Sequence, residues 1–164
     1  TIVVFAITST LIVAWCTSDY WLTLKWYQAT ILWLLFLDIA GGIVANLSIG
    51  TNDYYNANPK KRWIFIAVNM QPLILAVVLQ STFSIAVGVW GYTIVSASIV
   101  NMLRRKTYHR LLASGLFAAA IIGYILLEIS LPLPITLVYL LYMMKLIVCF
   151  AVEYPGDKAS AVDH

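Results

Sequence analysis

Two opposite charges stand inside long apolar runs of this chain. Asp38 lies near the middle of one run, and Lys145 lies slightly past the middle of another. An unpaired charge at the centre of a membrane helix costs about 2.5–3.5 kcal/mol on insertion scales, so such residues usually mark something functional. At a rise of about 1.5 Å per residue, the two depths differ by only about 5 Å. We therefore expect an intramembrane ion pair, which either fixes helix register or forms a site for a proton, an ion or a polar solute.

The residues after the acid continue a narrow polar helix face. Asp38, Gly42 and Asn46 recur at helical spacing, so this face carries an acid, a gap and an amide. Gly41 and Gly42 favour close approach by a neighbouring helix, and they also fit a cavity wall where a ligand approaches the backbone.

The link over residues 51–58 is rich in side chains that form hydrogen bonds, and it contains Asp53, Tyr54 and Tyr55. Asn and Asp are common turn formers, which explains part of this composition without function. The length of the link and its place beside the polar face make it, as a loop, the candidate lid or mouth of a site.

A third apolar run contains Asn69, Gln71 and Pro72. Proline removes one helix hydrogen bond and frees a carbonyl about four residues earlier. Amides beside a broken turn either build a solute or ion site at membrane depth or stabilise a kink. Tyr139 and Tyr142 are spaced to line the same interior as the lysine. The candidate ligand-binding residues are Asp38, Asn46, Asp53, Tyr54, Tyr55, Asn69, Gln71 and Lys145.

These residues need helices to position them, and the composition predicts membrane helices. Hydrophobic residues make up 62% of the 164 positions and charged residues 10%, against about 45–50% and about 25% in soluble domains. Continuous apolar runs of about 20 residues are typical of spanning helices and not of alternating barrel strands. We expect an all-α integral membrane protein with six spans in three short hairpins. The spans are 1–18, 26–48, 63–80, 84–103, 110–130 and 133–151.

The turn at residues 80–84 has neither Gly nor Pro, so a reading with five spans and one long kinked helix stays open. Residues 1–154 form one predicted membrane domain. Residues 155–164 form a tail whose last three residues look like the remnant of a tag.

Basic residues predict the orientation in the membrane. Seven cations fall in two links on one side, and the opposite links hold only Lys25. The seven are Lys60, Lys61, Arg62, Arg104, Arg105, Lys106 and Arg110. By the positive-inside rule both termini are cytoplasmic. We expect the cations to contact anionic lipid headgroups, so the net charge of +3 implies no nucleic-acid partner. The strong bias and the short chain favour a bacterial inner membrane.

Several chemistries lack their residues here. The sequence has no phosphate-binding glycine loop, serine-hydrolase elbow or dinucleotide fingerprint. It has no His/Cys cluster with metal-ligand spacing, so we expect neither a metal nor a cofactor, and we assign no catalytic residue. Gly115, Ala119 and Gly123 form a small-residue stripe, which predicts a packing seam within the bundle or between copies of the chain.

Three functions remain open from the sequence. The leading hypothesis is a small transport or solute-binding protein with a polar site in the cytoplasmic half of the membrane, acting on a small or lipophilic molecule. The second is a membrane-embedded enzyme that acts on a lipid or isoprenoid from the cytoplasmic face, with Asp38 or Asp53 as the acid-base group. The third is a non-catalytic scaffold or assembly subunit whose polar groups only specify packing.

Overall fold

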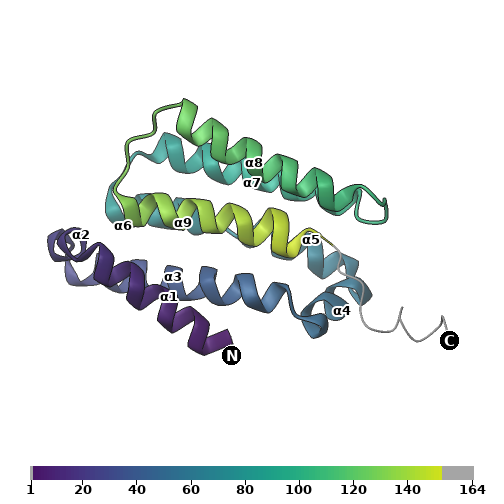
Figure 1. Ribbon diagram of the computed structural model, residues 1–164, viewed down its shortest axis with the longest axis horizontal. Coiled ribbons are helices and arrows are strands. Elements are labelled where there is room, and N and C mark those ends of the chain that lie inside the picture. The colour runs from purple at the N-terminus through teal and green to yellow at the C-terminus, as the bar shows by residue number, and fades with distance from the viewer. Residues whose placement is uncertain (1, 153–164) are drawn as a thin grey trace.

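The computed structural model describes residues 2–152, and over that range the chain folds into a bundle of helices (Figure 1). The elements in chain order are α1 (Ile2–Cys16), α2 (Ser18–Thr23), α3 (Trp26–Asn46), α4 (Ile49–Ala57), α5 (Pro59–Val68), α6 (Gln71–Leu79), α7 (Phe83–Met102), α8 (His109–Leu126), α9 (Leu133–Met143) and the π-helical segment η1 (Met144–Phe150). The predicted all-α membrane fold is confirmed. Residues 153–164, which include the predicted tail, lie outside the described residues.

Within residues 2–152, five spans are long and apolar enough to cross a membrane: Trp26–Asn46, Pro59–Leu79, Phe83–Met102, His109–Leu126 and Leu133–Phe150. The first predicted span appears as the shorter helix α1, whose 15 residues extend about 22 Å. This helix packs along α3, where a Cβ at Gly41 would lie 3.6 Å from the Cβ of Ala6. Gly41 therefore serves the helix packing that its residue type predicts.

The last span forms the centre of the bundle. In Figure 1, α9 and its continuation η1 lie between the α1/α3 pair and the α7/α8 pair, and η1 contacts α3, α7 and α8. Its residues Val138, Tyr139, Tyr142, Leu146 and Ile147 are fully buried. The surrounding helices expose many large apolar side chains instead, as expected for a surface that faces lipid.

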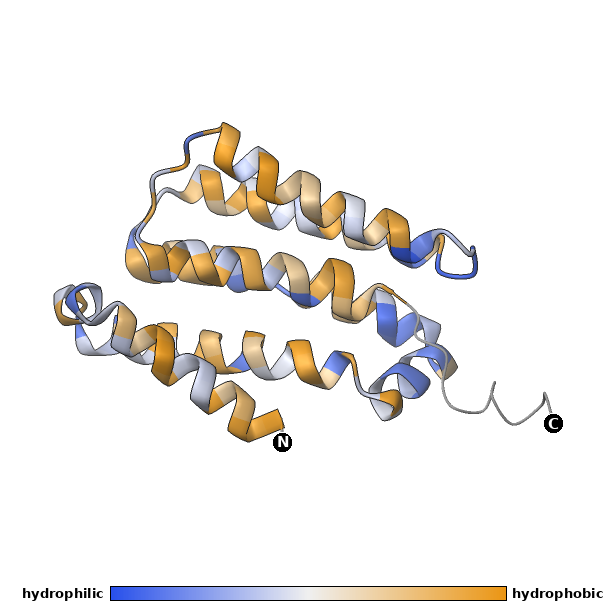
Figure 2. Cartoon of the chain, in the orientation of Figure 1, coloured by the Kyte–Doolittle hydropathy of each residue, from blue (hydrophilic) through white to orange (hydrophobic). Residues whose placement is uncertain are grey.

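Hydrophilic residues gather at one end of the bundle, over α4, the start of α5 and the loop between α7 and α8 (Figure 2). Six of the seven cations of the two basic links belong to the start of α5 and to this loop, and the seventh, Arg110, lies in the first turn of α8. We call this end the basic end; that it faces the cytoplasm stays a prediction from the positive-inside rule.

The structure corrects the prediction for one link between spans and decides between the two interpretations of another. Residues 51–58 were expected to form a loop, but most of them belong to helix α4. Its N-terminus is capped by Ser48, whose hydroxyl accepts a hydrogen bond from the amide of Thr51 at 3.4 Å. At the link over residues 80–84, α6 ends at Leu79, its C-cap residue Gln80 lies in the left-handed region at φ 50°, and α7 begins at Phe83. The two spans are therefore separate, and the reading with one long kinked helix across residues 80–84 is wrong.

Candidate functional site

The two membrane charges form an ion pair. Lys145 Nζ lies 2.8 Å from Asp38 Oδ2, which confirms the pairing that their shared depth predicts. The two partners differ in exposure: 3% of the lysine side chain is exposed, against 56% of the aspartate side chain. The pair is therefore closed on the side of the cation and open on the side of the carboxylate.

The polar face of α3 is built around the lysine. A Cβ at Gly42 would overlap Lys145 Cε and would lie 3.0 Å from Nζ, so the stem of the lysine occupies the space that glycine leaves. One turn further along α3, the side chain of Asn46 donates a long hydrogen bond of 3.5 Å to the carbonyl of Lys145. The predicted acid, gap and amide all contact one residue of the central helix.

Lys145 projects from an unusual stretch of helix. Met144–Phe150 is π-helical, and it is followed by a hydrogen bond from the amide of Ala151 to the carbonyl of Leu146 at 2.9 Å, which spans five residues. Wide π turns are uncommon and often lie at functional sites. The apolar sequence around the lysine contains no signal that predicts this geometry.

The third span is broken beside the ion pair. α5 ends at Val68 and α6 begins at Gln71, so Asn69 and Met70 interrupt the helix as the nearby proline predicts. Pro72 lies in the first turn of α6, where its missing amide hydrogen costs little. The Tyr142 hydroxyl donates to the carbonyl of Asn69 at 2.7 Å, and the Asn69 amide donates to the carbonyl of Phe65. The break therefore has a polar lining in the apolar interior.

Gln71 joins the broken turn to the ion pair. Its Nε2 donates to Asp38 Oδ2 at 2.9 Å and to Asn69 Oδ1 at 3.0 Å. Its Oε1 is buried without a hydrogen-bond partner among the described residues. Burial of an unpaired acceptor costs about 1–3 kcal/mol. This unpaired acceptor lies in the same side chain that donates to the carboxylate, so Gln71 keeps one unused hydrogen-bonding group beside the ion pair.

A cavity of about 420 Å³ leads from the basic end to the broken turn. It is lined by Tyr54, Tyr55, Lys61, Ile64, Phe65, Val68, Asn69 and Gln71. The lining includes four of the predicted site residues, and the hydrogen bond from Gln71 connects it to Asp38. Its size falls within the range of about 300–1,000 Å³ that is common for small-molecule sites.

Aromatic rings and one cation form the mouth of this cavity. The rings of Tyr54 and Tyr55 pack edge to face, with 5.2 Å between their centroids. Lys61 Nζ donates to the Tyr54 hydroxyl at 2.5 Å and lies 4.8 Å from the centre of that ring. Burial, followed by the neighbouring Tyr54, raises the pKa of the Tyr55 hydroxyl, while Lys61 acts in the opposite direction. Asp53 is exposed on α4 and is not among the lining residues of the cavity.

Arg62 is a buried residue that the sequence analysis missed as part of the interior. Only 1% of it is exposed. Its Nε donates to Asn101 Oδ1 at 2.6 Å, and its Nη2 donates to the carbonyls of Phe150 and Ala151 at 2.7 and 2.9 Å. A cation suits the carbonyl end of a helix, so this side chain fixes the end of the segment that carries the lysine. In sequence it is simply the third cation of a basic link.

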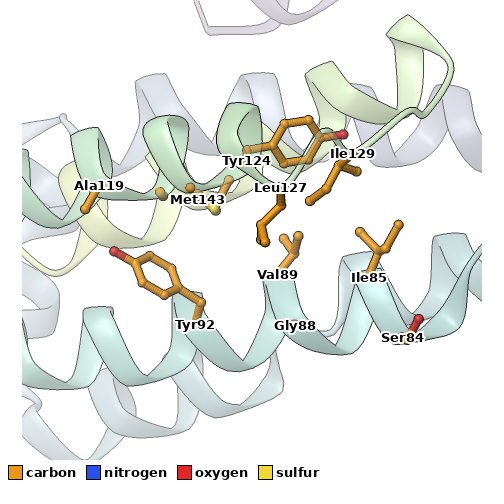
Figure 3. A pocket seen from close by; sticks show the side chains of 12 residues that line it. Ser84, Ile85, Gly88, Val89, Tyr92, Ala119, Tyr124, Leu127, Ile129 and Met143 are labelled. Carbon is orange, nitrogen blue, oxygen red and sulfur yellow. The ribbon is translucent and has the colours of Figure 1, made fainter.

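A second cavity, of about 450 Å³, lies away from these charges between α7, α8 and α9 (Figure 3). Ile85 and Val89 project into it from α7, and Leu127 projects from the end of α8. Ala119 and Gly123 also line it, and a Cβ at Gly115 or Gly123 would meet nothing within 4 Å. The small-residue stripe thus borders open apolar space and is not packed closely within the bundle. A role between copies of the chain stays a prediction.

No family model, curated protein or solved structure matches this chain. Among residues 2–152, no group of three His, Cys, Asp or Glu side chains is placed to hold a metal ion. The ion pair, the broken helix and the cavity are therefore the features of this molecule that bear on its function.

Proposed function

We propose that this chain is a small transport or solute-binding protein of the membrane, with its site where Asp38, Lys145, Gln71 and the broken turn meet. The observation that carries the proposal is the half-exposed carboxylate of Asp38, paired with a buried lysine and connected by Gln71 to a cavity that opens toward the basic end. Half-helix ends and intramembrane charges at one depth are a common way to bind solutes or ions within a membrane.

The open carboxylate supports a binding role over a purely structural one. A pair that only fixed helix register would gain most from burying both partners, because water weakens their attraction. Here the ammonium is enclosed, but the carboxylate remains accessible, and the neighbouring Gln71 Oε1 has no described partner. A hydrogen-bond donor can therefore reach the carboxylate without first breaking the pair, and a small rotation of the Gln71 side chain would bring its unpaired oxygen to the same donor.

The mechanism follows from competition for one carboxylate. A proton or a solute donor that reaches Asp38 weakens its attraction to Lys145, whose buried charge then lacks full compensation. The favoured response is a shift of the lysine or of η1 relative to α3, so solute occupancy biases the bundle between two packings. Gly42 gives the lysine stem room along this path.

Native mass spectrometry of the protein in nanodiscs made from its expression membrane tests the proposal. Wild type should retain a small-molecule adduct, and Asp38→Asn should lose it. The matched control is Asp53→Asn, because Asp53 is exposed and lies outside the cavity lining. The double variant Asp38→Asn/Lys145→Gln, which leaves no unpaired charge, separates loss of binding from loss of folding. Retention of the adduct by both Asp38 variants would refute the site.

A further inference from the structure

The cavity beside α5 changes character along its length. Lys61, Ile64, Phe65 and Val68 line it from one face of the helix, because they recur at three- and four-residue steps. From Lys61 to Val68 this wall extends about 10 Å. It begins with an ammonium group at the basic end and continues as apolar surface toward the membrane interior.

The apolar part of the wall is open at the side. Ile64 is 60% exposed and Val68 is 67% exposed, and both belong to a membrane-spanning segment. At this depth the surrounding medium is the acyl chains of the bilayer, so the groove is accessible to molecules that move within the leaflet. A solute that dissolves only in water would gain nothing from this wall.

The cationic end is fixed in place. The Lys61 ammonium is held by the Tyr54 hydroxyl and by the face of its ring. Both groups present hydrogen-bond donors, and the first turn of α5 lies at the basic end, where acidic headgroups are concentrated in membranes that follow the positive-inside rule. An acidic head is therefore the charge complement of this end of the groove.

We infer that the solute of the proposed site is an anionic amphiphile with a single chain, which enters sideways from the leaflet at the basic end. Its acidic head lies against Lys61 and Tyr54, and its chain lies over Ile64 and Val68. The cavity of about 420 Å³ falls near the lower end of small-molecule sites, which favours one chain over a whole two-chain lipid. The inference rests on the proposed function, because the groove ends at Asn69 and Gln71, which also belong to the proposed solute site.

Photolabelling in nanodiscs of uncharged phosphatidylcholine tests the inference. The probes are diazirine derivatives of dodecanoic acid and of dodecanol, which share a chain and differ in charge at neutral pH. In wild type, the acid should label the Pro59–Leu79 segment about fivefold more than the alcohol does, as expected for one cation at a membrane surface. Lys61→Gln should remove this preference, whereas Lys60→Gln, which changes an exposed cation outside the cavity lining, should preserve it.

A second pair of variants tests the apolar wall. Val68→Trp should fill the groove and reduce labelling by both probes, because Val68 lines the cavity. Its side chain is exposed, so a larger side chain at this position does not displace the protein core. Val77→Trp is the matched control, since Val77 is equally exposed on α6 but lies outside the lining. Equal effects of the two lysine variants, or unchanged labelling in Val68→Trp, would overturn the inference.

The two proposals fail in different ways. If Asp38→Asn loses its adduct while Lys61→Gln labels like wild type, the solute site stands and the amphiphile is wrong. If labelling depends on Lys61 and Val68 but Asp38→Asn retains the adduct, the groove binds an amphiphile and the proposed function is wrong.

Discussion

Replacing Asp38 with asparagine should destabilise the protein more than replacing Lys145 with glutamine, although both changes break the same ion pair. Asp38→Asn leaves an ammonium that is 3% exposed without its counterion. Lys145→Gln leaves a carboxylate whose side chain is 56% exposed and still accepts a hydrogen bond from Gln71. The remaining charge is therefore buried without a counterion in one variant, whereas in the other it stays exposed and hydrogen-bonded.

The structure sets the size of the difference. At the observed separation of 2.8 Å, two unit charges attract by about 6 kcal/mol at an effective dielectric constant of about 20, which is an upper bound for a half-open pair. Removing one partner of a buried pair costs about 3–5 kcal/mol. We expect about 3 kcal/mol for Asp38→Asn and about 1 kcal/mol for Lys145→Gln. The double variant should lie within about 1 kcal/mol of wild type, because no unpaired charge remains.

The assay is the free energy of unfolding in mixed micelles, measured by titration with a denaturing detergent and followed by circular dichroism. All four proteins of the cycle are measured under one condition, so that detergent effects cancel. If Lys145→Gln were the more damaging change, or if the double variant lost as much stability as Asp38→Asn, the burial argument would be refuted.

Three further outcomes follow from individual contacts. Gly42→Ala should cost about 1–3 kcal/mol in the same unfolding assay, because its Cβ overlaps the stem of the paired lysine, whereas Gly41→Ala meets only ordinary contacts and should be neutral. Arg62→Lys should cost about 3 kcal/mol or more, since an ammonium cannot reproduce the forked contacts of a buried guanidinium; Lys60→Gln on the exposed surface should change stability by about 0.5 kcal/mol or less. Burial and Tyr54 raise the pKa of Tyr55 above its ordinary value of 10.0, so the neutral hydroxyl favours the folded state below pH 10 and this contribution is lost as pH rises through the folded pKa. Ultraviolet titration of wild type against Tyr55→Phe should therefore place the missing tyrosinate step above pH 10.

The sequence predicted the features that depend on single helices and depth. Asp38 and Lys145 were paired from their positions along two apolar runs, because an unpaired charge there is expensive and depth follows directly from residue count. The break near Asn69 followed from Pro72, since proline acts on its own helix. The polar face of α3 likewise needed only helical spacing.

Features that depend on contacts between distant segments could not be predicted from the sequence. Arg62 belongs to a run of three cations, and only the fold shows that its side chain turns inward to the carbonyls of Phe150 and Ala151. Asp53 looked equivalent to its neighbours Tyr54 and Tyr55, but the helical phase of α4 leaves it off the cavity lining. The π-helical turns that present Lys145 arise from packing at the centre of the bundle and leave no mark in local composition.

The most direct test asks whether water and solutes reach the polar site from the basic end. Cysteine is placed at position 71 in a protein carrying Cys16→Ser and Cys149→Ala, and a charged thiosulfonate that cannot cross membranes is added to either face of oriented vesicles. Gln71→Cys should react only from the basic side, while Val77→Cys, exposed to lipid, and Val138→Cys, in the core, should stay unlabelled. Failure of Gln71→Cys to react from the basic side, with Asp38 and Lys145 intact, would contradict an accessible site within the membrane.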